Sequence, residues 1–190
     1  MNLANFLTLC RFGLSGLLVY FLFADGPSSK YLALAVFVLG CATDYLDGKI
    51  ARRLKEITPL GQLLDPIADK ALNYGALLSF AFLSIIPGWI VGVMLTREIF
   101  VTLVRVAGLR TGAAVSAESL GKIKTISQDV VIVAVLLFLI FSETGWWNEA
   151  WTGPARAVIL AAMLGVLILT LASGLSYVLG RFRRAHAGTR

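Results

Sequence analysis

Charged side chains are scarce in this chain. Asp, Glu, Lys and Arg make up 15% of its 190 residues, whereas hydrophobic residues make up 58%. Soluble domains carry about 25% charged and 45–50% apolar residues. This composition therefore excludes an ordinary soluble protein and indicates an integral membrane protein. Histidine occurs once and cysteine twice, and the two cysteines do not have the spacing of metal ligands.

The chain also lacks the pattern of a nucleic-acid-binding protein. Its formal net charge is +6, but no basic face with interleaved polar groups appears in the sequence. Lys and Arg in the loops and tails of an apolar chain fit anionic lipid headgroups or a phosphorylated substrate better. We therefore expect membrane lipids as partners and no nucleic acid.

Apolar runs long enough to cross a bilayer, at about 20 residues per span, dominate the sequence. We expect an all-α membrane protein with six transmembrane helices that form a single domain over residues 1–190. The expected spans are Phe6–Ala24, Tyr31–Leu54, Leu60–Ile85, Trp89–Leu109, Lys122–Phe141 and Ala155–Leu179. A short amphipathic start, Met1–Thr8, is predicted to lie in the membrane interface. Thr58 and Pro59 have the residue types of a helix N-cap and first helical position.

Lysine and arginine are unevenly distributed between the two sides of the expected bundle. Most lie at or after the ends of the second and fourth spans, at the start of the fifth span or in the C-terminal tail: Lys49, Arg52, Arg53, Lys55, Arg105, Arg110, Lys122, Lys124, Arg181, Arg183, Arg184 and Arg190. The opposite loops hold little beyond Lys30 and Arg156. The positive-inside rule then places both termini in the cytoplasm, and we expect the basic tail to contact anionic lipid.

Four aspartates are concentrated in one short stretch. Asp44 and Asp47 are three residues apart and Asp65 and Asp69 are four apart, so each pair shares one face of a helix. Two such pairs on neighbouring helices would repel each other unless cations lay between them. Because oxygen-only ligands favour hard cations, we predict a site for Mg²⁺ or Mn²⁺ at the cytoplasmic face of the membrane.

Small and basic residues flank this acidic face. Gly48 lies four residues after Asp44 and Ala51 four after Asp47, which would let a ligand approach the helix backbone, although plain helix packing also explains small residues. Arg52 could bind a phosphate or could anchor the helix at the cytoplasmic face. Ion pairing of the aspartates with neighbouring Lys and Arg residues is the alternative to a metal site, but it does not require this fixed spacing.

The whole stretch resembles the signature of the CDP-alcohol phosphotransferase family, with every position present. It reads Asp44-x2-Asp47-Gly48-x2-Ala51-Arg52-x8-Gly61-x3-Asp65-x3-Asp69. Further motifs resemble the phosphatidylglycerophosphate synthases of that family, although Ala4 stands where a proline is usual. These motifs are Asn5-Phe6-Leu7-Thr8-x2-Arg11, Thr96-Arg97-Glu98-Ile99, Arg105, Arg110 and Gly121-Lys122-x-Lys124-Thr125-x2-Gln128. The resemblance covers roughly residues 2–130.

This resemblance implies that an alcohol attacks the β-phosphate of CDP-diacylglycerol and that CMP leaves. For the synthases the alcohol is sn-glycerol 3-phosphate and the product is phosphatidylglycerophosphate. The resemblance implies two bound ions, Mg²⁺ or Mn²⁺, held by Asp44, Asp47 and Asp65. Asp69 would complete the metal site and act as the general base for the attacking hydroxyl.

The family also implies contacts and an assembly that the sequence pattern alone does not give. The residues expected to contact the CDP moiety are Gly48, Ala51, Arg52 and Gly61. The resemblance further implies a homodimer in the bacterial inner (cytoplasmic) membrane, with its active site facing the cytoplasm.

A phosphorylated acceptor requires several cationic side chains. The candidates are Arg97, Arg105, Arg110, Lys122 and Lys124. Arg97 could instead pair with Glu98 or with a partner helix. Asp129, inside the fifth expected span, fits a polar contact between helices and a substrate role equally well.

The family signature leaves the acceptor open. Inositol phosphate, serine, phosphatidylglycerol or a diacylglycerol-type alcohol would use the same signature, and the motifs around Arg97 and Lys122 favour glycerol 3-phosphate. A cation transporter with intramembrane carboxylates is an alternative from another class. Transporters commonly show paired repeats with helices interrupted at the midplane, whereas here the acids cluster at one face and no repeat is visible.

Overall fold

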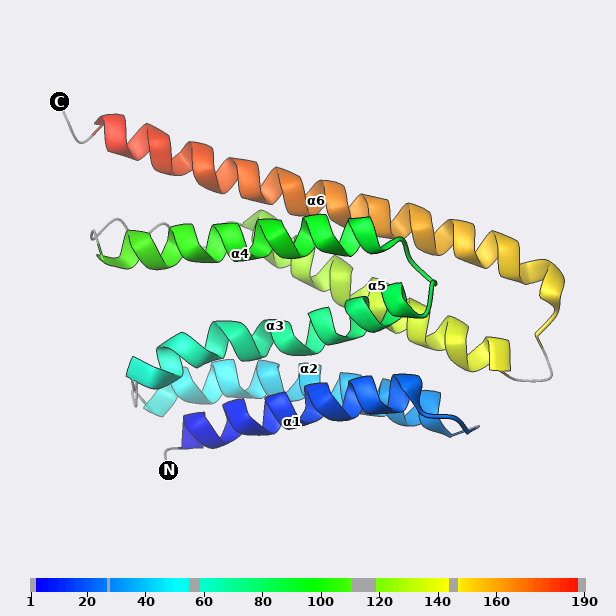
Figure 1. Cartoon of the computed structure of the whole chain (residues 1–190). Coiled ribbons are helices and arrows are strands. Elements are labelled where there is room, and N and C mark those ends of the chain that lie inside the picture. Colours follow the sequence, from blue (N-terminus) through cyan, green and yellow to red (C-terminus); the bar gives the residue numbers. More distant parts are fainter. Residues whose placement is uncertain (1–2, 27, 55–58, 111–118, 144–146, 188–190) are drawn as a thin grey trace.

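The computed structural model describes residues 3–26, 28–54, 59–110, 119–143 and 147–187. Side chains are described for residues 9–26, 28–43, 70–104, 121–143 and 147–177. The regular structure in the described part is entirely helical (Figure 1): α1 (Leu3–Phe23), α2 (Ser29–Leu54), α3 (Pro59–Phe82), α4 (Gly88–Arg110), α5 (Ser119–Glu143), the 3-10 helix η1 (Glu149–Trp151) and α6 (Thr152–Ala187). The expected all-α architecture is confirmed, with one helix for each expected span.

The helix ends follow the local sequence. Helix α3 is described from Pro59 onward, and Thr58, its predicted N-cap, lies outside the described residues. At its other end Ser84 adopts a left-handed φ of 56°. The Ser84 N–H donates to the Ala81 carbonyl at 3.0 Å, and the Ile85 N–H donates to the Phe80 carbonyl at 2.9 Å. This pair of bonds is a Schellman motif, and it ends α3 where the chain reverses into α4 (Figure 1).

The corner between α1 and α2 is held by Lys30. Its ammonium donates to the carbonyl of Leu22 in the last turn of α1 at 2.9 Å and to that of Ala24, just after the helix, at 3.3 Å. The last carbonyls of a helix have no intrahelical partner. Lys30 Nζ also lies 3.7 Å from Glu143 Oε1 at the end of α5. Helix α1 itself starts at Leu3 and continues without a break, so the predicted interfacial start and the first span form one helix.

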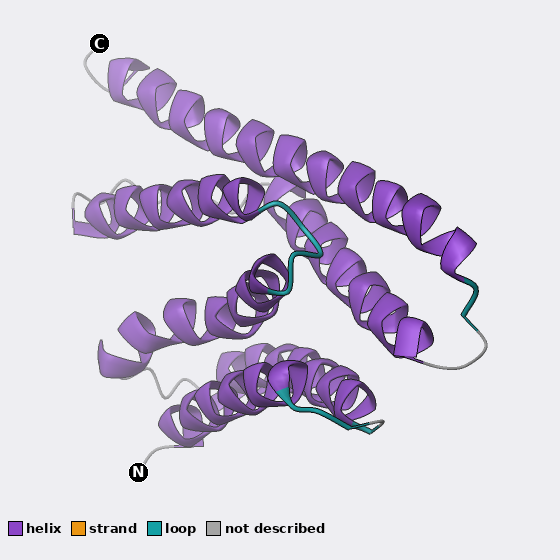
Figure 2. Ribbon diagram, turned by 45° about the vertical axis from the view of Figure 1, so that its right-hand side comes forward, coloured by secondary structure: helices purple, strands orange, loops and turns teal. Residues whose placement is uncertain are grey.

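The helices pack in two groups that α3 and α5 connect. Helix α1 packs against α2 and α3, and α6 packs against α4 and α5. Helix α5 crosses between the groups and contacts α2 and α3 (Figure 2), while α3 also contacts α4. Helix α2 ends, α3 begins and α4 ends at the same end of the molecule as both termini (Figure 1).

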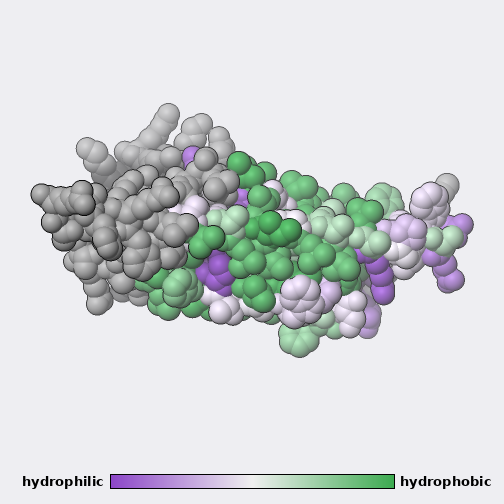
Figure 3. Space-filling model, turned by 90° about the horizontal axis from the view of Figure 1, so that it is seen from above, coloured by the Kyte–Doolittle hydropathy of each residue, from purple (hydrophilic) through white to green (hydrophobic). Residues whose placement is uncertain are grey.

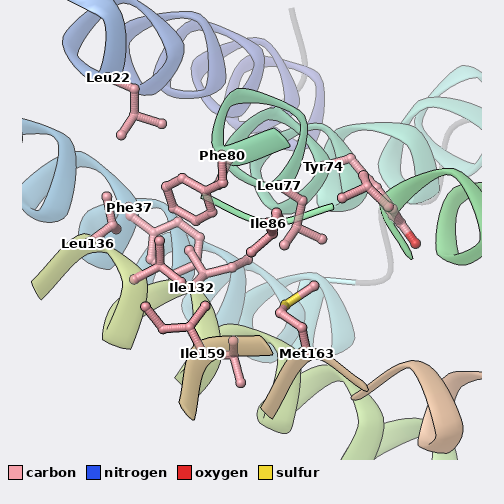
Figure 4. Close-up of a cluster of buried hydrophobic side chains, with 14 of the residues drawn as sticks. Leu22, Phe37, Tyr74, Leu77, Phe80, Ile86, Ile132, Leu136, Ile159 and Met163 are labelled. Carbon is pink, nitrogen blue, oxygen red and sulfur yellow. The ribbon is translucent and has the colours of Figure 1, made fainter. Parts of the chain in front are cut away.

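A single buried hydrophobic cluster holds these helices together. Figure 4 shows Phe37 of α2, Phe80 of α3, Leu136 of α5 and Met163 of α6 converging at its centre. Each of these four side chains is at most 1% exposed, and the cluster also includes residues of α1 and α4. Burial of side chains of this size from every helix is what fixes their relative positions.

The outer surface is also apolar. Large hydrophobic side chains such as Phe82, Val158 and Ile168 are at least two-thirds exposed, and Figure 3 shows an apolar band with hydrophilic residues at the end where α6 begins. Within the described residues two helices are long and apolar enough to cross a membrane, Gly121–Glu143 and Glu149–Tyr177. Such a surface suits contact with lipid rather than water.

Candidate active site

The four signature aspartates lie on two consecutive helices, α2 and α3, near the end where the chain connects them. Asp44 and Asp69 each lie ten residues from that end, and Asp47 and Asp65 lie seven and six residues from it. At 1.5 Å per residue these offsets are about 15 Å and about 10 Å along the helix axis. Because the two helices run in opposite directions and contact each other, both aspartate pairs lie toward the same end of the molecule.

The side chains of residues 44–69 lie outside the described part of the structure. The assignments of the four aspartates as metal ligands therefore remain predictions, as do the CDP contacts assigned to Gly48, Ala51, Arg52 and Gly61. Among the side chains that are described, no group of three or more His, Cys, Asp or Glu residues could hold a metal ion. By its chemistry the donor set of the signature, four carboxylates on neighbouring helices, fits a hard divalent cation.

Lys70 directly follows Asp69 and is the first residue of α3 whose side chain is described. It belongs to a cluster of charged residues. Glu98 of α4 pairs with three cations. Lys70 Nζ lies 3.0 Å from Glu98 Oε1, Lys124 Nζ lies 2.6 Å from Oε2, and Arg97 Nη1 lies 2.9 Å from Oε2. The Glu98 side chain is 13% exposed and that of Lys124 is 8% exposed. We call Lys70, Arg97, Glu98 and Lys124 the Glu98 cluster.

Two hydroxyl residues extend the Glu98 cluster and complete its links between helices. Arg97 Nη2 donates to Ser173 Oγ of α6 at 2.7 Å. Lys70 Nζ donates to Thr102 Oγ1 at 2.5 Å, and the Thr102 hydroxyl donates to the Glu98 carbonyl at 2.8 Å. The cluster thus joins α3, α4, α5 and α6, and its three cations share one carboxylate.

The structure separates the five acceptor-phosphate candidates. Arg97 and Lys124 lie in the Glu98 cluster, whereas Lys122 is exposed near the start of α5. Arg105 and Arg110 lie on the last turns of α4, and their side chains are outside the described part. The sequence left open whether Arg97 pairs with Glu98 or with a partner helix. In the structure Arg97 pairs with Glu98 and also donates to Ser173 of α6. Phosphate binding by any of the five remains a prediction.

Two more polar contacts hold α3 just beyond Asp69. Asn73 Nδ2 donates to Asp129 Oδ1 of α5 at 2.7 Å. Asp129 therefore makes a polar contact between helices, which is one of the two roles expected for it from the sequence. The hydroxyl of Ser15 on α1 donates to the Ala71 carbonyl at 2.8 Å. Within one turn, α3 is therefore bonded to α1, α4 and α5.

Sequence reasoning missed Lys70 and the central place of Glu98. The available signal was Glu98 itself, because it is the one acidic residue of the apolar segment that forms α4. A carboxylate in such a segment needs cationic partners. The sequence supplied Arg97 as a neighbour, but the partners from α3 and α5 come from packing.

Gly174 of α6 makes room for the Arg97 guanidinium. A Cβ at this position would lie 2.6 Å from Arg97 Nε, and the guanidinium is held on both sides by Glu98 and Ser173. We expect Gly174→Ala to cost about 1–3 kcal/mol of stability, as overpacking does, and to lower the unfolding temperature in detergent.

The matched control for this substitution is Gly165→Ala on the same helix. A Cβ at Gly165 meets nothing within 4 Å, so alanine should leave the unfolding temperature unchanged or raise it slightly. Equal unfolding temperatures for the two variants would contradict the packing of Arg97 against Gly174.

Comparisons with known proteins agree on one family. Residues 1–183 match the family described as CDP-alcohol phosphatidyltransferase. A protein of Mycobacterium tuberculosis named a probable phosphatidylglycerophosphate synthase is 35% identical over 180 residues, which cover 93% of this chain and 80% of that protein. The CDP-diacylglycerol–glycerol-3-phosphate 3-phosphatidyltransferase of Bacillus subtilis is 37% identical over 148 residues, covering 72% and 77%.

A relative that is named for a different activity is also similar. The cardiolipin synthase (CMP-forming) of Streptomyces coelicolor is 38% identical over 123 residues, covering 64% of this chain and 55% of that protein. The family match spans the whole aspartate signature and the Glu98 cluster, and it makes the chain an enzyme rather than the transporter considered above. The chain thus belongs to the CDP-alcohol phosphatidyltransferase family of membrane enzymes.

Proposed function

We propose that this enzyme transfers the phosphatidyl group of CDP-diacylglycerol to sn-glycerol 3-phosphate, giving phosphatidylglycerophosphate and CMP. The names of the relatives from M. tuberculosis and B. subtilis support this acceptor. The observation that carries it is the Glu98 cluster, in which three cations share one carboxylate directly after Asp69. Excess positive charge in a partly buried site is costly unless an anion balances it, and a dianionic acceptor phosphate would do so.

In the proposed reaction the acceptor hydroxyl attacks the β-phosphorus, and the bond from that phosphorus to the CMP oxygen breaks. Asp69 accepts the hydroxyl proton, which is the role that the family resemblance implies for it, and this role requires Asp69 to lie within reach of the hydroxyl. Enzymes of this family generally depend on a divalent metal, and Asp44, Asp47 and Asp65 would hold it together with Asp69. A bound divalent cation would supply neutralisation of the charge on the pyrophosphate.

The remaining parts of the proposal concern donor binding and topology. Gly48, Ala51, Arg52 and Gly61 would contact the CDP moiety where α2 and α3 connect. We propose six transmembrane helices with both termini and the active site on the cytoplasmic side of the bacterial inner membrane. The concentration of Lys and Arg at the end of the molecule that holds both termini supports this orientation. A homodimer rests on the family resemblance alone.

The test is an acceptor comparison with purified enzyme in detergent. CMP release from CDP-diacylglycerol is measured with Mg²⁺ and, in turn, glycerol 3-phosphate, phosphatidylglycerol, inositol phosphate or serine, and the lipid product is identified by mass spectrometry. We expect turnover with glycerol 3-phosphate and phosphatidylglycerophosphate as the product. Turnover with phosphatidylglycerol that yields cardiolipin would instead assign the activity named for the S. coelicolor relative.

The acceptor pocket makes a separate prediction for Lys122 and Arg110. Losing one charge-assisted bond to phosphate costs about 1.5–3 kcal/mol, or roughly ten- to a hundredfold in affinity. Lys122→Ala or Arg110→Ala should therefore raise the KM for glycerol 3-phosphate by that factor and leave the KM for CDP-diacylglycerol nearly unchanged. Both constants are measured for each variant.

The control for these variants is Arg156→Ala. Arg156 is an exposed cation at the start of α6, at the opposite end of the molecule, so both KM values should stay at the wild-type level. Equal effects of Lys122→Ala on donor and acceptor would mean that the acceptor pocket lies elsewhere. Lower yield with both constants unchanged would show that Lys122 only anchors the helix.

A further inference from the structure

Glu98 forms an ion pair with Lys70, the residue that follows Asp69. We propose that Glu98 is a positioning residue for the transfer reaction: through Lys70 it fixes the turn of α3 that carries Asp69 relative to α4 and α5. This inference rests on the proposed function, in which Asp69 is the general base. Neither the signature nor the acceptor candidates include Glu98 or Lys70.

The link between Glu98 and α3 is short and doubly bonded. Lys70 Nζ lies 3.0 Å from Glu98 Oε1 and donates to Thr102 Oγ1 at 2.5 Å. Thr102 lies one turn after Glu98 and donates back to the Glu98 carbonyl. Both partners of Lys70 thus belong to one turn of α4. Because Asp69 and Lys70 are consecutive residues of a hydrogen-bonded helix, a movement of Lys70 along α4 also moves the backbone of Asp69.

Glu98 is itself fixed from three sides, which makes it a suitable anchor. Its second oxygen, Oε2, pairs with Lys124 of α5 and with Arg97 of its own helix. Arg97 in turn donates to Ser173 of α6. The carboxylate therefore cannot follow Lys70 without giving up its contacts to Lys124 of α5 and to Arg97, which is itself bonded to α6.

A purely stabilising role explains this arrangement poorly. Buried ion pairs contribute little net stability, and apolar residues of similar size often replace them without loss. The other bonds of this turn of α3 are made by neutral donors, Ser15 on α1 and Asn73. Among the described contacts of this turn, Lys70 makes the one between two charged side chains, and it lies nearest to Asp69. A need to position Asp69 accurately explains a charged contact next to it, because small displacements of a reacting group lower the rate strongly.

The experiment compares Glu98→Gln, Lys70→Met and the double variant with wild type. For folded, monodisperse protein in detergent, kcat is measured together with the KM for CDP-diacylglycerol and the KM for whichever acceptor gives wild-type turnover. A raised acceptor KM with unchanged kcat would assign Lys70 and Glu98 to acceptor binding and overturn the positioning role. We expect each single variant to lower kcat by about ten- to a hundredfold, with the donor KM within about twofold. The double variant should be no slower than the slower single variant, because both substitutions remove the same link.

Tyr74→Phe is the matched control. The Tyr74 hydroxyl donates to the Met94 carbonyl at 3.1 Å, so this variant removes a neutral bond between the same two helices, one turn further from Asp69. Its kcat should equal that of wild type. An equal loss in Tyr74→Phe would show that any contact between α3 and α4 matters, and it would overturn a specific role for Glu98.

Other outcomes also decide the proposal. Wild-type kcat in folded Glu98→Gln, or losses that add in the double variant, would overturn it. If Glu98→Gln does not fold, Lys70→Met and Lys70→Arg decide instead: Met should lower kcat, and Arg, which can still pair with Glu98, should retain most of it. Wild-type kcat in Lys70→Met would overturn the proposal. Absence of wild-type turnover with glycerol 3-phosphate would reject only the proposed acceptor, since the variants are compared with the acceptor that works.

Discussion

Asp44→Asn and Asp65→Asn are each expected to abolish turnover while the protein still inserts and folds. An amide retains a neutral oxygen but loses the negative charge that binds a hard cation. Loss of the metal would remove several kcal/mol of transition-state stabilisation. A loss of about 4 kcal/mol is roughly a thousandfold in kcat.

The measurement is CMP release by enzyme that has been treated with chelator and resupplied with Mg²⁺. Asp25→Asn serves as the control, because Asp25 is an exposed carboxylate in the connection between α1 and α2, at the end of the molecule away from the signature (Figure 1). It should keep the wild-type rate. Wild-type turnover in Asp44→Asn or Asp65→Asn would remove the metal assignment from that residue.

Asp69→Asn is expected to slow the chemical step and to leave donor binding largely intact. A positioned general base contributes about 10²–10⁴-fold, so kcat should fall by a factor in that range. An interaction needed only in the transition state lowers kcat without weakening the ground-state complex. The affinity for CDP-diacylglycerol should therefore stay near the wild-type value.

Single-turnover kinetics and equilibrium nucleotide binding, measured on the same preparation, test this expectation. Asp65→Asn is the informative comparison, because a metal ligand should weaken nucleotide binding as well as the rate. If Asp69→Asn loses nucleotide affinity together with turnover, Asp69 is a metal ligand and the base must be sought elsewhere.

The helices could be predicted from the sequence because apolar runs of bilayer length have few other stable structures. Pro59 is predicted to be the first helical position of α3, since its fixed φ suits that position, and the described part of α3 includes it. The extent of α6 was less predictable. It continues to Ala187, beyond the last apolar residues, because the Arg-rich segment that follows is made mostly of residues that favour helix.

The Glu98 cluster shows where sequence reasoning stopped. Lys122 and Lys124 are two residues apart, so they lie about 200° apart around α5, and the structure leaves the first exposed and buries the second. Periodicity predicts that they differ but not which one faces inward. Lys70 and Glu98 are distant in sequence, and they meet because the apolar faces of α3 and α4 pack together. Such a contact depends on tertiary packing, which no local pattern encodes.

Helix α6 is a single unbroken helix that is longer than a bilayer is thick, so a change of tilt at one end also moves the other end. The helix has 36 residues, or about 54 Å, against a hydrocarbon core of about 30 Å. Residues 180–187 continue the helix beyond the apolar run of the sequence, which ends at Leu179. A span adjusts its tilt to bilayer thickness, and a continuous helix passes that tilt to its end. Thinning or thickening of the bilayer would therefore swing the arginines at that end toward or away from the headgroups.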